Sequence, residues 1–148
     1  MKNKIRLFVA FAALFALGSA CNMSTANISS FKVSKDKAGT QETKDFKAGE
    51  TIYAATVIAN SPDKVTVKTY LTADDAPMLN KGETVPGSEV NVELPGSGTA
   101  NYSLPIPAGL KGGRFTLHAE MINAAGEKKD SKHENIKIEP ASAGTSSP

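Results

Sequence analysis

Hydrophobic and polar side chains alternate along most of the chain after residue 50. The clearest case is VTVKTYLT, in which one face carries Val65, Val67, Thr69 and Leu71 and the other carries Thr66, Lys68, Tyr70 and Thr72. The same period of two recurs in EVNVELP at 89–95, TANYSLPIP at 99–107 and RFTLHAEM at 114–121. A period of two predicts β-strands that bury one face, and this region shows no pattern typical of a long helix.

Three further segments complete the set of expected strands. TIYAATVIAN at 51–60 has apolar residues on both faces of the expected strand, so we expect this strand to be central or partly covered. Ser30–Ser34 and Glu134–Glu139 supply a first and a last strand. Turn-forming Gly, Pro, Asn and Ser separate the strands at Asn60–Asp63, Val85–Ser88, Pro95–Gly98 and Ala124–Glu127. About seven strands at this spacing predict an all-β fold, a single antiparallel β-sandwich.

Two short motifs resemble parts of immunoglobulin-like and fibronectin type III domains. LKGGRF, Leu110 to Phe115, resembles the corner before strand F, where a leucine, a glycine and an aromatic residue recur at this spacing. INAAGEKKDS, Ile122 to Ser131, resembles the F–G hairpin of bacterial immunoglobulin-like domains. The chain departs from antibody domains because it has no tryptophan, no pair of cysteines and Phe115 in place of the corner tyrosine. The resemblance implies an immunoglobulin-like fold and no activity.

The first 20 residues have the three parts of an export signal. MKNKIR is basic, the run from Leu7 to Leu17 is apolar, and Gly18-Ser19-Ala20 ends the segment with small residues. A membrane-spanning helix needs about 20 apolar residues, and this run is shorter. We therefore expect residues 1–20 to be a signal peptide that is removed.

The only cysteine of the chain, Cys21, follows directly. The segment resembles a bacterial lipoprotein signal, which implies cleavage before Cys21 and lipid attachment to it. Gly18 stands where that family usually has leucine or valine, so cleavage by an ordinary signal peptidase stays open. Asn22 is not the aspartate that retains lipoproteins at the inner membrane of Gram-negative members, which favours the outer membrane. The whole chain resembles small bacterial lipoproteins, a group that implies no activity.

The mature chain divides into a tether, one domain and a tail. Residues 21–27 carry the lipidated cysteine and a short tether, and 28–139 are long enough for one domain. Residues 140–148, PASAGTSSP, are expected to be a disordered tail. Removing the three basic residues of the signal leaves 14 basic and 15 acidic residues, a formal charge of −1. Without a basic stripe, the sequence does not predict nucleic-acid binding.

Few residues carry reactive chemistry. With a two-residue turn at Ala125-Gly126, His118 would face His133 across a hairpin near Glu120, but two ligands do not make a zinc site. Asp74-Asp75 is the only adjacent carboxylate pair and lacks the spaced acidic ladder that calcium needs. The common hydrolase, nucleotide and metal motifs do not occur. We expect no catalytic residue, no cofactor and no metal.

These observations favour a non-catalytic, lipid-anchored interaction module of the bacterial cell envelope. The expected contact surface is the outward row Thr66, Lys68, Tyr70 and Thr72, because it is flat and centred on an aromatic residue. The alternative is a module that binds a ligand, either a glycan or a metal. Proteins usually bind sugars by stacking them on an exposed tryptophan or tyrosine. Tyr70 is the only tyrosine that the pattern places clearly outward.

Overall fold

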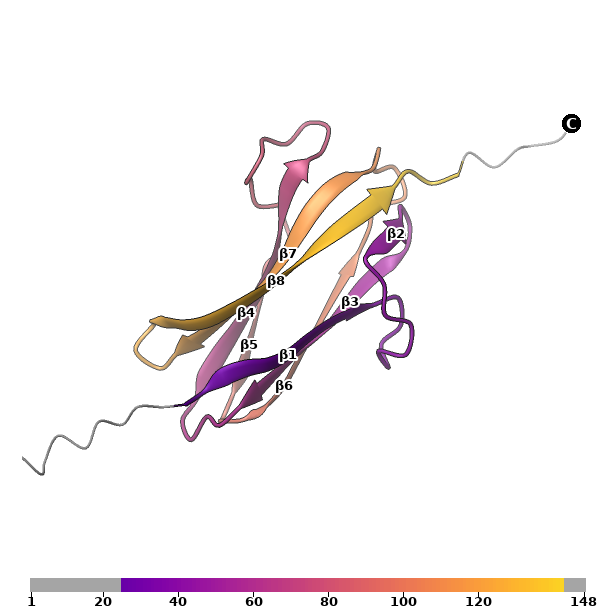
Figure 1. Ribbon diagram of the computed structural model, residues 1–148. Helices are drawn as coiled ribbons and strands as arrows, with labels where there is room; N and C mark the ends of the chain where they lie inside the picture. Colours follow the sequence, from indigo (N-terminus) through magenta and orange to yellow (C-terminus); the bar gives the residue numbers. More distant parts are fainter. Residues whose placement is uncertain (1–24, 143–148) are drawn as a thin grey trace, which may run out of the picture.

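The computed structural model describes residues 25–142, and this part of the chain forms eight strands and no helix. The strands are β1 (Asn27–Ser34), β2 (Asp45–Lys47), β3 (Thr51–Ala59), β4 (Val65–Asp75), β5 (Val90–Leu94), β6 (Gly98–Pro105), β7 (Gly113–Asn123) and β8 (Lys128–Glu139). One sheet has the order β1-β3-β6 and the other β2-β8-β7-β4-β5, and the two face each other (Figure 1). The predicted all-β sandwich is confirmed. Its sheets resemble the A-B-E and G-F-C-C′ sheets of immunoglobulin domains.

Buried side chains lie on the predicted faces of the strands. In β4, Val65, Val67, Thr69 and Leu71 are buried, while the three residues between them and Thr72 after them are partly exposed. In β7 the expected residues Phe115, Leu117, Ala119 and Met121 are buried, and Thr116 on the other face is buried as well. The strand at 51–60 corresponds to β3, which lies between β1 and β6 as its apolar composition predicted. Local alternation thus determines which side chains enter the core.

The short strand β2 departs from the sequence prediction. It pairs in parallel with β8, with Phe46 beside Ile138, whereas an entirely antiparallel sandwich of about seven strands was expected. A period of two cannot be recognised in three residues, so nothing in the local sequence marks this strand. Phe46 is nonetheless buried, and it belongs to the same core cluster as Ile138 of β8.

The hairpin between β7 and β8 has the predicted register and a different turn. His118 pairs with His133, as expected. The turn is a three-residue loop, in which Asn123 N–H donates to the Glu127 carbonyl and Gly126 has a φ of 82°. A bulge between Met121 and Ile122 then restores the register that a two-residue turn would have produced. The prediction of that turn was therefore wrong, although the facing pair is correct.

The corner before β7 requires two glycines in tight surroundings. Gly112 has a φ of 83°, and a Cβ atom on it would lie 2.8 Å from the Ile138 carbonyl oxygen. Gly113 has a φ of 148°, and its Cβ would lie 2.8 Å from the Cβ of Ala76. Phe115 follows and is buried in the larger of the two core clusters. The aromatic ring thus occupies the core, which is the packing role expected from the corner motif.

The two ends of the sandwich hold different parts of the chain. We term the end at which β1 begins the near end and the opposite one the far end. At the near end, Ala26 lies with the 61–65 segment and the hairpin residues Asn123 to Ala125 around one hollow. The far end holds the long loop 76–89, the 106–112 corner and the end of β8 (Figure 1). The chain therefore enters the domain at the near end, whereas β8 ends at the far end.

Candidate functional site

The expected contact row lies on the outer face of the five-stranded sheet. Thr66, Lys68, Tyr70 and Thr72 are all partly exposed on β4, which has β7 on one side and β5 on the other. Their cross-strand neighbours on β7 are, in order, Ile122, Glu120, His118 and Thr116. The row is therefore one line of a continuous surface that also includes β7 and β8.

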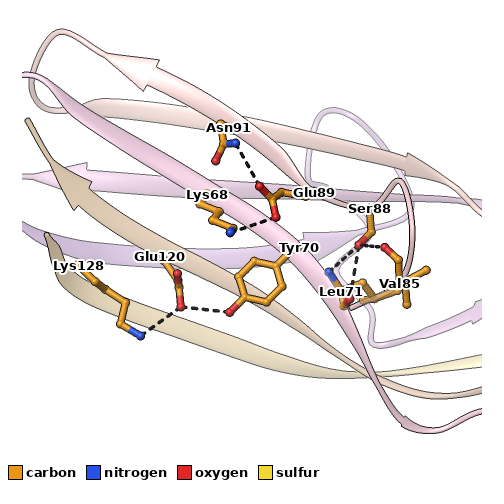
Figure 2. Close-up of polar contacts among 9 residues, drawn as sticks. All are labelled: Lys68, Tyr70, Leu71, Val85, Ser88, Glu89, Asn91, Glu120 and Lys128. Carbon is orange, nitrogen blue, oxygen red and sulfur yellow. Dashed lines mark hydrogen bonds and ion pairs between the residues drawn. The ribbon is translucent and has the colours of Figure 1, made fainter. Parts of the chain in front are cut away.

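Tyr70 is held in place by two neighbours on β7. Its ring stacks on His118 with centroids 4.8 Å apart and planes at 13°. Its hydroxyl donates to Glu120 Oε1 at 3.1 Å, and Glu120 also accepts from Lys128 Nζ at 3.2 Å (Figure 2). Partial burial and the bond to Glu120 raise the pKa of Tyr70, so the phenol stays protonated at neutral pH. Stacking and this bond together fix the ring against the sheet.

Lys68 borders Tyr70 on the side of β5. Its ammonium group lies 5.2 Å from the centre of the Tyr70 ring and 3.0 Å from Glu89 Oε2 (Figure 2). The lysine hydrogen bond lowers the pKa of Glu89, which keeps that carboxylate ionised. A cation over an aromatic face is attracted by the negative charge density of the ring. The charge of Lys68 is thus partly neutralised within the surface itself.

His118 joins Tyr70 to the next strand. Its Nε2 lies 2.9 Å from Thr72 Oγ1, and its ring centre is 6.2 Å from that of His133 on β8. Burial lowers the pKa of His118, and His133 lowers it further. The side chain is therefore neutral at pH 7. Tyr70, His118 and His133 form a row of three rings across β4, β7 and β8, which we term the aromatic row.

The two candidate metal positions of the sequence do not form closed ligand sets. Among the described residues no three His, Cys, Asp or Glu side chains are grouped so that they could hold a metal ion. Asp74 and Asp75 have different partners: Asp74 accepts from the Thr116 hydroxyl at 2.7 Å, and Asp75 binds Arg114 at 3.1 Å. The bulge in β4 between Ala73 and Asp75 separates their roles.

Sequence reasoning found Tyr70 and did not find its supports. His118 and Glu120 were recognised as outward residues of their own strand, but the register between β4 and β7 joins segments about 50 residues apart. No local signal specifies that register. Tyr53 was also not expected outside, and the structure places it partly exposed on the outer face of β3.

Cys21, the expected lipid attachment residue, lies outside the described residues 25–142. Within that range no helix is long and apolar enough to cross a membrane. The first described strand begins at Asn27, six residues after Cys21 in the sequence.

Comparisons with known proteins identify similar folds. No protein-family model and no curated protein matches the chain. A Niemann-Pick type C2 protein from the Japanese carpenter ant aligns with a TM-score of 0.52 and 13% identity, over 80% of this chain and 96% of that one. This likeness shows a shared β-sandwich fold alone.

Two further solved structures align less closely. An immunoglobulin-like protein from Pseudomonas aeruginosa has a TM-score of 0.48 and 10% identity, over 79% of this chain and 98% of that one. A family 76 glycoside hydrolase from a bovine Bacteroides thetaiotaomicron strain has a TM-score of 0.46 and 15% identity, over 76% of this chain. The chain spans only 20% of that hydrolase.

Proposed function

We propose that this protein is a non-catalytic interaction module of the bacterial cell envelope, anchored by a lipid on Cys21. It contacts a partner protein through the outer face of the five-stranded sheet, with Tyr70 at the centre. The observation that carries the proposal is the aromatic row, in which Tyr70 stacks on His118 and donates to Glu120.

A fixed aromatic side chain suits a binding surface for an energetic reason. Association costs about 0.5–1.5 kcal/mol for each flexible side chain that becomes ordered at an interface. Tyr70 is already ordered by His118 and Glu120, so a partner would not have to bear that cost. Tyrosine is also enriched among the residues that dominate binding energy at protein interfaces.

The surroundings of Tyr70 favour a protein partner over a sugar. His118 covers one face of the ring, and the Lys68 ammonium lies over the ring as well. A sugar would need an open ring face for stacking. A partner protein can instead contact the ring edge together with the flat, β-branched neighbours Thr66 and Thr72.

The proposed anchor rests on the sequence before the domain. A single cysteine directly after an apolar run and small residues is the arrangement of lipoprotein signals. Stable membrane attachment takes two or more acyl chains, which a lipidated N-terminal cysteine carries. Because β1 begins six residues after Cys21, the near end would face the membrane.

Crosslinking in intact cells tests the partner surface. The yield of crosslinked complex is compared for the wild type, Tyr70→Ala and Tyr53→Ala, followed by identification of the attached protein. Tyr53 is the matched control, because it is a partly exposed tyrosine on the outer face of the other sheet. We expect a loss of affinity of about 2 kcal/mol, and hence a clear fall in yield, for Tyr70→Ala alone. Equal yields for all three proteins would exclude this face.

Lipid labelling tests the anchor separately. The wild type should incorporate labelled fatty acid and sediment with membranes, and Cys21→Ser should do neither. A wild-type protein that is found in the soluble fraction with a free thiol would contradict the anchor and leave the contact surface untouched.

A further inference from the structure

A hollow of about 380 Å³ lies at the far end of the five-stranded sheet. It crosses β2, β8, β7 and β4, beyond the aromatic row, and its volume falls within the range of about 300–1,000 Å³ that small-molecule sites occupy. Four cationic and two acidic side chains line it, namely Lys44, Lys81, Arg114 and Lys137, and Asp45 and Asp74. The lining thus contains two more cations than carboxylates, although three of its cations are paired with carboxylates outside it.

A β-bulge directs one carboxylate toward the polar part of the hollow. Ala73 pairs with Phe115 and Asp75 pairs with Arg114, so Asp74 is the extra residue of β4. Its Oδ2 accepts from the Thr116 hydroxyl at 2.7 Å, and that hydroxyl lies 3.2 Å from Asn135 Oδ1. Bulges are common where a strand re-aims a side chain next to a functional site. Three adjacent strands thus contribute a carboxylate, a hydroxyl and an amide to one place.

The corner glycine allows this bulge. A Cβ atom at Gly113 would lie 2.9 Å from the Asp75 carbonyl oxygen and 2.8 Å from the Ala76 Cβ. Only a glycine lets β7 approach the bulged end of β4 so closely. The position of Asp74 is therefore specified by the backbone and not by a flexible side chain alone.

The cations around the hollow differ in their availability. Arg114 is paired with Asp75, Lys137 with Glu139, and Lys44 with Glu134. Lys81, on the 76–89 loop, makes no ion pair among the described residues, and its side chain is exposed. Lys81 can thus bind an anion without first breaking an ion pair.

We propose that this hollow binds an acidic saccharide, a sugar unit that carries a carboxylate or a phosphate. Lys81 and Arg114 contact the anionic group, while Asp74, Thr116 and Asn135 bind ring hydroxyls. A simple anion fits the hollow poorly because Asp74 would repel it. A metal cation fits poorly because the ammonium group of Lys81, which no carboxylate of the described residues neutralises, lies at the site. A ligand with both an anionic group and hydroxyl donors can pair with Lys81 and donate hydrogen bonds to Asp74.

The site is separate from the proposed protein-binding surface. It uses the far end of the sheet, whereas that surface is centred on Tyr70. Tyr70→Ala should leave saccharide binding unchanged, so failure of either proposal can be told from failure of the other.

Calorimetric titration of the full chain in detergent tests the site. The probes are a galacturonate oligosaccharide against its methyl ester, and a hexose phosphate against the parent hexose and inorganic phosphate. Each pair differs only in the charge or the sugar, so the two sources of negative charge are distinguished. We expect one acidic sugar to bind and its neutral counterpart to bind at least tenfold more weakly.

Two variants and one control complete the test. Lys81→Gln and Asp74→Asn should each weaken binding by about tenfold, the loss expected for one charge-assisted hydrogen bond. Lys37→Gln, at another exposed lysine that lines a different surface, should change nothing. Three outcomes would overturn the proposal: no binding of either acidic sugar at millimolar concentration, inorganic phosphate bound as tightly as hexose phosphate, or equal affinities for the lysine variants.

Discussion

The Tyr102 hydroxyl donates a hydrogen bond to the Ser88 carbonyl at 2.9 Å, which joins β6 of the three-stranded sheet to the loop before β5 inside the core. Ser88 is fully buried, and its own hydroxyl donates to the Val85 carbonyl at 2.7 Å and accepts from Leu71 N–H at 3.1 Å (Figure 2). Ser88 thus supplies the hydrogen bond that a neighbouring strand would give to Leu71. Burial also raises the pKa of Tyr102, which keeps the phenol a donor.

Replacing Ser88 or Tyr102 should destabilise the domain. Ser88→Ala leaves the buried Leu71 N–H without an acceptor, so we expect a loss of about 1–3 kcal/mol in the free energy of unfolding. Tyr102→Phe should cost about 0.5–1.5 kcal/mol, because it removes one bond to a carbonyl. Urea unfolding of both single variants and the double variant measures these losses. Because Ser88→Ala keeps the backbone carbonyl that Tyr102 binds, the two losses should be nearly additive, and an unchanged urea midpoint for Ser88→Ala would contradict the role of its hydroxyl.

Leu117 should be among the most sensitive positions of the core. It is fully buried on β7 and belongs to the larger core cluster. Leu117→Ala should lower the free energy of unfolding by about 2–5 kcal/mol. Thr99→Ala, at an exposed position of β6, should change it by less than about 0.5 kcal/mol. A similar urea midpoint for the two variants would show that the faces of β7 are assigned wrongly.

Gly113 and Gly109 provide a matched test of the corner. A Cβ atom at Gly113 meets the 75–76 backbone below 3 Å, whereas at Gly109 it meets nothing within 4 Å. Gly113→Ala should therefore destabilise the domain by about 1–3 kcal/mol or more. Gly109→Ala should be neutral or slightly stabilising, by up to about 1 kcal/mol, because it restricts the unfolded chain. Thermal unfolding of the two proteins decides the matter, and equal melting temperatures would count against the tight corner.

Protonation of His118 at low pH should lower the free energy of unfolding. Burial, and then His133, lower its pKa in the folded state, while the unfolded side chain titrates near pH 6.5. Below about pH 6.5 the unfolded state then binds more protons than the folded state. The free energy of unfolding therefore decreases as the pH is lowered through that range. Urea midpoints at pH 7.5 and 5.5 measure the fall. His118→Gln should show a smaller difference between the two pH values than the wild type, and an unchanged difference would exclude His118 as the cause.

The faces of the strands could be read from the sequence because alternation is a local property. Val65 to Leu71 and Phe115 to Met121 place their own side chains, whatever strand lies beside them. The facing pair His118 and His133 was predicted correctly from a wrong turn, because the bulge between Met121 and Ile122 compensates for the extra loop residue. For the strand faces, a few consecutive residues contain the whole signal.

The remaining features depend on contacts between distant segments. The stack of His118 on Tyr70 requires the register of β4 with β7, and the parallel pairing of Phe46 with Ile138 joins segments about 90 residues apart. The bulge at Asp74 likewise depends on how closely Gly113 approaches. Sequence alone therefore identified the candidate surface but not the side chains that hold it in place.

The opposite placement of the two ends has a mechanical consequence. For a molecule held beyond Asn27 and pulled by a ligand at the far end, the force runs along the strand axes. β1 and β3 are antiparallel, and their ladder extends from Asn27 with Ala59 to Ser34 with Tyr53. Such a load shears this ladder, so its hydrogen bonds resist together and do not open one after another. The same fold pulled across its strands would unzip at a much lower force.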